Sequence, residues 1–496
     1  MSTFWIRALQ LILALSFLVV IHELGHFAFA RLFKVRVEKF YMFFNPQFSI
    51  LRMKKINGKW RIKFFAKNVP YSMTEATDEQ GTPLLDKKGK PVYRPMTEDE
   101  LYALPEDDWR RYPDATEWGI GWLPFGGYCS IAGMVDETTA AGQLVSEPQP
   151  WEYRSKSTWQ RLPIIIGGVL VNFVAALIIY SAILFTWGKE YLPLDNAVYG
   201  LQYSDVMLEQ GFAQGDKIIA IGDRKPETTA DLVQWMLIDG ERNVTVLRGD
   251  DTLQLQLADN LDQLVLASGN TALVDFRFPF VVNEIIPDGA AAKALMMAGD
   301  SVIAVDGVAT LAYQDVVAEL QKHACDSVTV EFVRQGETMT VRTYLGDEAK
   351  LGVYPNKPLD YLQTKKIEYG FFASIPAGIE YGWDVLVSYV KQFKLVFTKE
   401  GSKSLGGFGA IGSLFPPVWD WHSFWLMTAF LSIILAFMNI IPIPGLDGGH
   451  VFFLLWEMLT GKKPSDKFLE IVNTIGFYLL LALVIYANLN DILRLF

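Results

Sequence analysis

Four long apolar stretches divide the chain. They cover residues 4–33, 162–187, 424–443 and 471–489, and polar sequence separates them. Each has about the 20 residues that a helix needs to cross roughly 30 Å of hydrocarbon. The first stretch contains His and Glu residues, and Arg7 is the only basic residue near its start, so we interpret it as a retained span rather than a signal peptide. The pattern predicts a multi-pass α-helical membrane protein with four transmembrane helices.

The charged residues indicate which side of the membrane each polar segment occupies. Residues 31–67 carry eleven basic residues and one acidic residue, whereas residues 188–423 carry 19 basic and 32 acidic residues. Short loops rich in Lys and Arg stay in the cytoplasm, so we expect the loop after the first span to be cytoplasmic and residues 188–423 to lie outside. The formal net charge of −11 provides no basic surface for a nucleic-acid backbone, so the expected partner is the lipid bilayer and not nucleic acid.

The long outer segment contains an internal repeat. Residues 215–223 and 299–307 each consist of a Gly-Asp turn followed by an alternating apolar strand. This pattern resembles tandem PDZ domains, which bind peptide termini by adding a strand to a sheet edge; a generic small β-domain is the alternative. We therefore expect two β-rich PDZ-like domains, at 194–270 and 278–355, inserted between the second and third spans.

Between the repeat and the third span, apolar residues recur at helical spacing. Trp383, Leu386, Val390 and Phe397 belong to this stripe, and Lys391 lies off it. The pattern is typical of a helix that lies in the membrane interface. An ordinary helix packed on the second repeat is an equally good interpretation.

The first span contains the residues best suited to chemistry. His22 and His26 are one helical turn apart, so both imidazoles can reach one metal ion, and Glu23 lies beside them. This is the H-E-x-x-H arrangement. Each of these polar groups costs about 2 kcal/mol or more to insert at membrane depth, so each requires a partner inside the protein. Ordinary packing of satisfied polar groups is the alternative.

A second polar passage follows the third span. Residues 439–450 contain two prolines and three glycines, which break the helix at membrane depth, where irregular backbone is tolerated only if it lines a cavity. Asp447 is the one carboxylate in this passage. Catalytic zinc takes three protein ligands, so Asp447 is a candidate to join His22 and His26. An Asx turn or a helix cap is the other common use of an Asp next to Gly.

Together these motifs resemble the bacterial site-2 proteases, a family of intramembrane zinc metalloproteases. The similarity covers nearly the whole chain and is greatest for the sigma-E-regulating branch, which carries tandem PDZ domains. It implies that Zn²⁺ is held by His22, His26 and Asp447 and that Glu23 is the catalytic base. A closed four-ligand shell completed by His450 would instead favour a PDZ-bearing scaffold or a transporter-like, ion-handling protein with a structural metal site.

The resemblance also implies a substrate-binding region. After the first span the family has membrane-associated β-strands that end in a Gly-Gly-Tyr passage, here Gly126, Gly127 and Tyr128, and this loop is expected to add a strand to an unwound substrate. Asn439 matches a substrate-contacting Asn of the family. Asn172 matches a second-span Gly-Pro-x-x-Asn-Phe passage, except that the Pro is replaced in this chain, and we expect it to contact substrate as well.

By this resemblance the protein cuts transmembrane segments of single-pass membrane proteins, such as an anti-sigma factor or remnant signal peptides, in regulated intramembrane proteolysis. It would reside in the bacterial inner membrane, with the PDZ-like domains in the periplasm and the active site near the cytoplasmic side. Residues 45–117 are longer and more charged than the compact loop expected for the family.

The expected division of the chain is a first transmembrane helix at 1–33, a cytoplasmic loop with membrane-associated β-strands at 34–161, a second transmembrane helix at 162–187, PDZ-like domains at 194–270 and 278–355, an amphipathic interfacial region at 360–423, and third and fourth transmembrane helices at 424–447 and 471–490.

Overall fold

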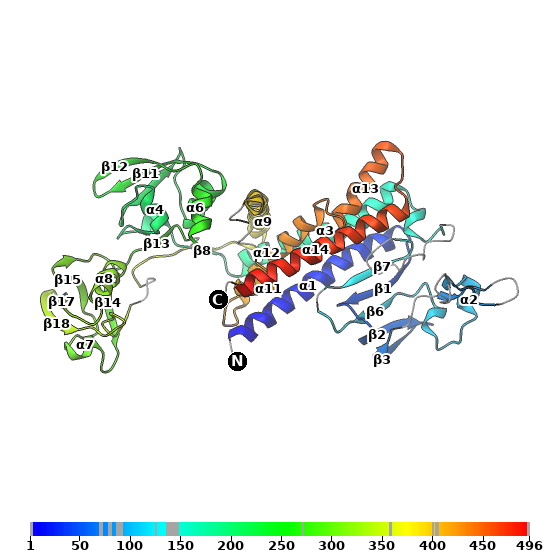
Figure 1. The fold of residues 1–496 in the computed structure, drawn as a ribbon, viewed down its shortest axis with the longest axis horizontal. Helices are drawn as coiled ribbons and strands as arrows, with labels where there is room; N and C mark the ends of the chain where they lie inside the picture. The colour runs from blue at the N-terminus through cyan, green and yellow to red at the C-terminus, as the bar shows by residue number, and fades with distance from the viewer. Residues whose placement is uncertain are drawn as a thin grey trace. The chain divides into compact units, whose positions relative to one another are not determined.

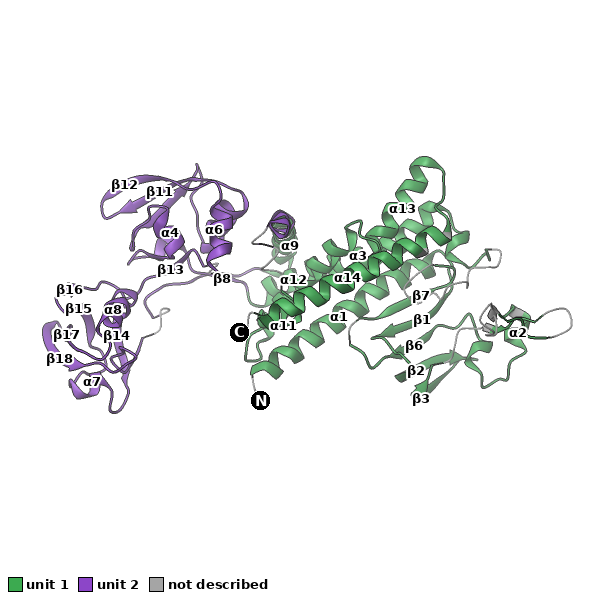
Figure 2. Ribbon diagram, in the orientation of Figure 1, with its two compact units in different colours: residues 1–187, 370–389, 405–496 green, residues 188–369, 390–404 purple. Residues whose placement is uncertain are grey.

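The chain forms two compact units. The computed structural model describes residues 3–68, 73–77, 82–85, 93–124, 126–134, 148–269, 272–356, 360–398, 401 and 406–493. One unit consists of residues 1–187, 370–389 and 405–496, and the other of residues 188–369 and 390–404 (Figure 2). Residue 270, the expected end of the first PDZ-like domain, lies outside the described residues.

The first unit contains four helices that are long and apolar enough to cross a membrane. They are α1 (Thr3–Leu32), α3 (Thr158–Thr186), α12 (Trp421–Ile440) and α14 (Asp466–Leu493) (Figure 1). This confirms the four candidate transmembrane helices within the described part of the chain. Helix α3 begins several residues before the expected start because Ser157 and Gln160 form a capping box that includes the polar turn.

Helix α3 lies at the centre of this unit and contacts α1, α12 and the short helix α13 (Asp447–Thr460). The crossing with α1 brings the backbones of Gly25 and Gly167 together, since a Cβ at either position would overlap the other residue's carbonyl group. Small residues allow this close approach where lipid provides no hydrophobic drive for helix association. The two helices that carry the polar candidates in the first and second spans therefore lie in direct contact.

A five-stranded sheet in the first unit follows α1 in the chain. Its strand order is β3-β2-β6-β1-β7, and only the β1–β6 pair is parallel among the pairs that join these strands. Strand β7 forms one edge of the sheet and contacts α1. The strands are β1 (Val37–Met42), β2 (Phe48–Ile56), β3 (Lys59–Lys67), β6 (Glu117–Ile120) and β7 (Tyr128–Ile131), and the intervening elements are β4 (Met73–Glu75), β5 (Tyr93–Pro95), α2 (Glu98–Tyr102) and η1 (Trp109–Arg111).

The second unit contains two β-rich parts, each with its own buried apolar core. Both share the order strand, short helix, strand, helix, hairpin and return strand, with α6 added after the hairpin in the first part and the short strand β16 added after β15 in the second. The first part consists of β9 (Leu201–Tyr203), α4 (Asp205–Glu209), β10 (Lys217–Ile221), α5 (Thr229–Leu232), η4 (Val233–Ile238), β11 (Asn243–Arg248), β12 (Asp251–Gln256), α6 (Leu261–Ser268) and β13 (Val274–Phe276). The second consists of β14 (Phe280–Ile285), α7 (Ala290–Lys293), β15 (Ser301–Val305), β16 (Val308–Ala309), α8 (Tyr313–Leu320), β17 (Ser327–Arg334), β18 (Glu337–Tyr344) and β19 (Val353–Pro355).

The two parts differ in how their strands pair. The first part has a three-stranded sheet, β10-β11-β12, and a separate β9–β13 pair, whereas the second has one six-stranded sheet. Before and after both parts, β8 (Lys189–Tyr191) and β20 (Lys365–Ile367) pair as an antiparallel ribbon. The insertion between the second and third spans therefore starts and ends at neighbouring backbone positions. The assignment of the two parts as PDZ domains stays a prediction.

Helix α9 (Phe371–Phe393) is the longest helix that lies entirely within residues 360–423, the region expected to be interfacial. Within the first unit it lies against α3, where Tyr381 stacks edge-on against Tyr180 with ring centroids 4.8 Å apart. Its Tyr389 ring contacts Phe430 and Phe437 of α12. The contacts of this helix in the first unit are thus with transmembrane helices. The rest of the expected region contains η7 (Lys394–Phe397) and α11 (Phe408–Ser413).

Candidate metal centre

His22, His26 and Asp447 come together within the first unit. The Nε2 atoms of the two histidines lie 3.2 Å apart, and Asp447 Oδ2 lies 3.2 Å from His22 Nε2 and 3.4 Å from His26 Nε2. All three side chains are mostly buried, with exposed fractions of 12%, 8% and 17% in chain order. Among the described residues, this is the one group of three His, Cys, Asp or Glu residues that could hold a metal ion.

These three atoms fit a tetrahedral metal ion. Ligands at the usual zinc distances of about 2.0–2.1 Å lie roughly 3.3 Å from one another in tetrahedral geometry, which agrees with the separations of 3.2–3.4 Å. Asp447 Oδ2 is buried and has no hydrogen-bond partner among the described residues. A buried carboxylate oxygen that faces two imidazole nitrogens requires a cation or a proton, and three converging ligand atoms match the protein ligands of a catalytic zinc.

Hydrogen bonds to the far side of each ring determine how the histidines are oriented. His26 Nδ1 lies 2.8 Å from the carbonyl oxygen of Ile164 and donates to it, which leaves Nε2 with a lone pair. His22 Nδ1 lies 3.2 Å from the side-chain amide of Asn172. The oxygen and nitrogen of that amide are interchangeable by rotation, and the amide oxygen has no partner among the described residues. With this oxygen placed on His22 Nδ1, both histidines direct lone pairs at the same point.

Asn172 therefore lies beside His22, fully buried, rather than on an accessible surface. The hydroxyl of Ser432 on α12 donates to the Asn172 backbone carbonyl, at 2.7 Å.

Sequence reasoning did not single out Gly168, which is also essential to the geometry of the two histidines. A Cβ at Gly168 would lie 2.5 Å from His26 Nε2 and 2.7 Å from His22 Nε2, so a larger residue would occupy the space between α3 and the imidazoles. The Gly-Gly pair within an apolar span was the available signal.

Asp447 is the first residue of α13, immediately after the break that Pro442 and Pro444 impose on α12. A carboxylate in the first helical turn is favoured by the helix dipole. Asn439 lies in the last turn of α12, is partly buried and does not belong to the three-residue group. His450 lies one turn after Asp447, but its Nε2 is 3.5 Å from the Asn473 amide. It is not part of the metal-ligand group among the described residues.

Glu23 is partly buried beside His22 on α1. The Gly126–Tyr128 passage lies against the same helix, since a Cβ at Gly127 would be 2.7 Å from Val19 Cγ1. Tyr128 stacks on Tyr41, with ring centroids 5.3 Å apart, and its hydroxyl donates to Asn45 Oδ1 at 2.9 Å. The start of β7 is therefore held close to the turn of α1 that precedes His22.

A buried hydrogen-bond network supports this edge of the sheet. The Tyr41 hydroxyl donates to Glu117 at 2.6 Å and accepts from Ser49 at 3.1 Å. Burial and the nearby Glu117 carboxylate raise the pKa of Tyr41 well above its usual value, so the hydroxyl remains a donor. Asn45 donates to Ser49 and accepts from Tyr128. Sequence reasoning missed this network because its members are separated by up to 83 residues.

An H-E-x-x-H helix that meets a carboxylate inside a membrane protein defines a membrane metalloprotease. The family model described as Peptidase family M50 matches residues 10–81 and 108–483, so the chain belongs to peptidase family M50. The unmatched residues 82–107 fall within the extended, charged loop expected from the sequence.

Named relatives agree with this class. The chain is 25% identical to "Regulator of sigma-E protease RseP" of Salmonella typhimurium over 100% of both chains. It is 26% identical to "Regulator of sigma E protease" of Haemophilus influenzae, over 78% of this chain and 89% of the relative. It is also 26% identical, over 98% of both chains, to a Borreliella burgdorferi protein whose name describes a zinc metalloprotease.

Proposed function

We propose that this protein is a zinc protease of the site-2 type in the bacterial inner membrane, which cuts the transmembrane segment of another membrane protein. The observation that carries the proposal is the convergence of His22, His26 and Asp447, with separations of 3.2–3.4 Å, on helices of the membrane unit. Such polar groups are costly in a membrane interior, so their presence there indicates a function. The names of the relatives support zinc as the metal.

The chain's own residues divide the work of hydrolysis. His22, His26 and Asp447 would hold the zinc ion. Zinc, when bound, is a Lewis acid that activates water and stabilises negative charge on the scissile carbonyl. Glu23 takes the proton of the attacking water and later gives a proton to the leaving amine. Asn172 orients His22, a role that its burial supports better than substrate contact.

Substrate must unwind before it can be cut, because a helix hides its amide carbonyls in hydrogen bonds. Strand β7 pairs with β1 on one side and forms the edge of its sheet on the other. An unwound segment can pair with such an edge. Gly126, Gly127 and Tyr128 lead into this strand beside α1, and we assign them and Asn439 to substrate binding. Single-pass proteins such as an anti-sigma factor or remnant signal peptides are the substrates that we infer.

The test of this function is Glu23→Gln in the purified full chain. Zinc content should stay close to one ion per chain, while cleavage of a single-pass model substrate should fall at least ~100-fold, because the general base is lost. Glu380→Gln, an exposed position on α9, is the matched control and should cleave at the wild-type rate. Equal cleavage by Glu23→Gln and wild type would refute the protease assignment and favour a scaffold with a structural metal site.

We further propose that the two β-rich parts are periplasmic PDZ-like domains that exclude untrimmed substrates by size. The pairing of β8 with β20 supports the design of a deletion, because Lys189 and Ile367 are partners in this ribbon. Rejoining the chain between Lys189 and Lys365 should raise cleavage of substrates that keep a bulky outer domain and hardly change cleavage of trimmed ones. Loss of trimmed-substrate cleavage in a deletion protein that still holds zinc would show that the repeats deliver substrate by binding.

A further inference from the structure

Few residues of helix α14 are buried. Gly476 is the one buried residue among the positions of this helix whose burial the structure describes. The neighbouring Ile475 and Phe477 are 61% and 48% exposed, as expected for apolar side chains of a membrane span that faces lipid. Gly476 therefore marks a place where α14 lies directly against another segment of the first unit.

Gly476 lies against the turn that precedes Asp447. A Cβ at position 476 would be 1.8 Å from the carbonyl oxygen of Pro444, and one at Gly445 would be 3.2 Å from the backbone nitrogen of Phe477. Glycine is the residue that allows two backbones to approach this closely. Helix α14 therefore touches the backbone of the turn itself, and a larger residue at position 476 would displace either the helix or the turn.

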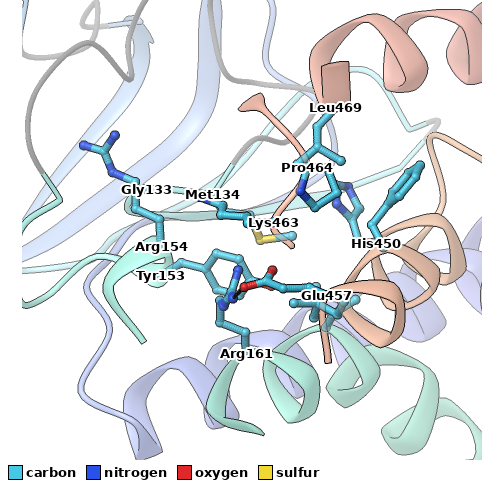
Figure 3. A pocket seen from close by; sticks show the side chains of 13 residues that line it. Gly133, Met134, Tyr153, Arg154, Arg161, His450, Glu457, Lys463, Pro464 and Leu469 are labelled. Atoms are coloured by element: carbon cyan, nitrogen blue, oxygen red, sulfur yellow. Dashed lines mark hydrogen bonds and ion pairs between the residues drawn. The ribbon is translucent and has the colours of Figure 1, made fainter. Parts of the chain in front are cut away.

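A second contact joins α14 to the segment that follows Asp447. Asn473 lies three residues before Gly476 and so on the same face of the helix. Its side-chain amide is 3.5 Å from His450 Nε2. Figure 3 shows His450 and Leu469, of α13 and α14, lining one open pocket. The face of α14 that carries Asn473 and Gly476 thus contacts the chain three residues before and three residues after Asp447.

The Asp447 carboxylate depends on its own backbone for its position. The rings of His22 and His26 are each oriented by a hydrogen bond at Nδ1, and metal-binding carboxylates are usually hydrogen-bonded as well. Asp447 Oδ2, however, has no hydrogen-bond partner among the described residues. Ligand atoms must be held within about 0.5 Å of their working geometry, so the backbone on either side of Asp447 has to supply that precision.

We propose that Asn473 and Gly476 are positioning residues, which hold Asp447 within reach of the two histidines for zinc binding. Gly476 supports the turn on one side of Asp447, and Asn473 supports the first turn of α13 on the other. The inference rests on the zinc ligands named in the proposed function. It adds a face of the fourth membrane helix to the support of the metal centre.

The test is the zinc affinity of the purified full chain, measured by competition with a coloured chelator. Gly476→Ala should lower this affinity about ten-fold or more, the scale of the loss when the support of a metal ligand is removed. Alanine is a better helix former than glycine, so the loss would come from the contact with the turn and not from α14 itself. Val484→Ile is the matched control, because it adds one carbon at an exposed position of the same helix, and it should bind zinc as wild type does.

A second background separates positioning from general stability. In Asp447→Asn, Gly476→Ala should cause little further loss of zinc affinity, because the ligand that Gly476 positions is already gone. The same fold loss in both backgrounds would show that Gly476 supports the fold as a whole, and it would overturn the proposal. Asn473→Ala adds no bulk and carries the test if Gly476→Ala does not fold. It should weaken zinc binding by a smaller factor in the wild-type background and not in Asp447→Asn.

The outcomes also separate this proposal from the proposed function. Wild-type zinc affinity in Gly476→Ala, or in Asn473→Ala if Gly476→Ala does not fold, would overturn the positioning role and leave the metalloprotease assignment intact. A wild-type chain that binds no zinc would overturn both.

Discussion

Buried carboxylates in the two units of this protein have opposite surroundings. In the second unit, Asp216 accepts two hydrogen bonds from Arg248, both at 2.8 Å, and one from the backbone of Ala213 at 2.9 Å. In the first unit, Asp447 Oδ2 is buried without a hydrogen-bond partner among the described residues and faces two imidazole nitrogens. The first carboxylate is satisfied by the protein itself. The second has an oxygen that a metal ion, or a proton on one of the two imidazoles, would satisfy.

The hydrogen-bonding arrangement around Asp216 occurs a second time, around Asp300. Asp300 accepts from Arg334 at 2.7 Å through both oxygens and from the backbone of Met297 at 2.8 Å. In both copies the backbone N–H that donates to the Asp belongs to the residue three positions before it. Each Arg also donates to a carbonyl five positions before that Asp, at Gly211 and Leu295 respectively. Asp216 and Asp300 thus each accept from an Arg and from a backbone N–H, whereas Asp447 Oδ2 faces two imidazole nitrogens and accepts no hydrogen bond from the other described residues.

The largest effect is expected when the unsatisfied carboxylate is replaced. Asp447→Asn removes the negative charge while keeping the size of the side chain. Zinc affinity should fall more than about 100-fold, because loss of even an outer-shell partner of a metal ligand costs 10–100-fold, and cleavage should fall to background. Metal analysis of the purified protein together with a cleavage assay tests this. Full zinc content in Asp447→Asn would exclude Asp447 as a ligand.

Replacing a satisfied carboxylate should reduce stability and leave the metal centre intact. Asp300→Ala should destabilise the second β-rich part by about 2–3 kcal/mol, since it removes charge-assisted hydrogen bonds and leaves Arg334 without its carboxylate. Asp216→Ala should cost less in the first part, because Arg248 is 40% exposed and Arg334 only 22%. Hydrogen exchange of β11 and β17 in the full chain measures both effects.

Zinc content and cleavage of trimmed substrates should distinguish these two variants from Asp447→Asn. Both should match wild type in Asp216→Ala and Asp300→Ala, because neither residue belongs to the metal-ligand group. If Asp300→Ala lost zinc as Asp447→Asn is expected to, the division between structural and metal-binding carboxylates would be wrong.

The sequence was sufficient for the features that depend on local spacing. Hydropathy predicted the four long helices, and the separation of four residues placed His22 and His26 on one face of α1. The recurrence of Gly-Asp identified the repeat, and an Arg ends a later strand in both copies, β11 in the first and β17 in the second. The sequence therefore contained both members of each ion pair, although only the structure joins them.

Features that depend on how helices cross or strands pair could not be predicted in the same way. The position of Asn172 beside His22 depends on the close contact of Gly25 with Gly167 and Gly168, which sets the rotation of α3 against α1. Parallel pairing of β1 with β6 joins Lys39 to Glu117 across 78 residues of chain. Neither relation has a periodic signal, because each depends on packing between distant segments.

The smallest expected effect is a dependence of the second β-rich part on acid. Burial raises the pKa of Asp300, but hydrogen bonds from Arg334 and Met297 and the Arg334 charge outweigh this, so the pKa lies below its usual value. The unfolded chain, with an Asp pKa of about 3.9, then binds more protons than the folded one. The stabilisation is fully present above that pH and is lost as the pH falls through the lower, folded-state pKa.

Hydrogen exchange of β17 and β18, corrected for the intrinsic exchange rate, should show opening that increases below about pH 4 in wild type and in the exposed control Glu337→Gln. Asp300→Asn should be destabilised at neutral pH yet show a flatter dependence on acid, and a slope equal to that of wild type would mean that Asp300 is not the titrating group.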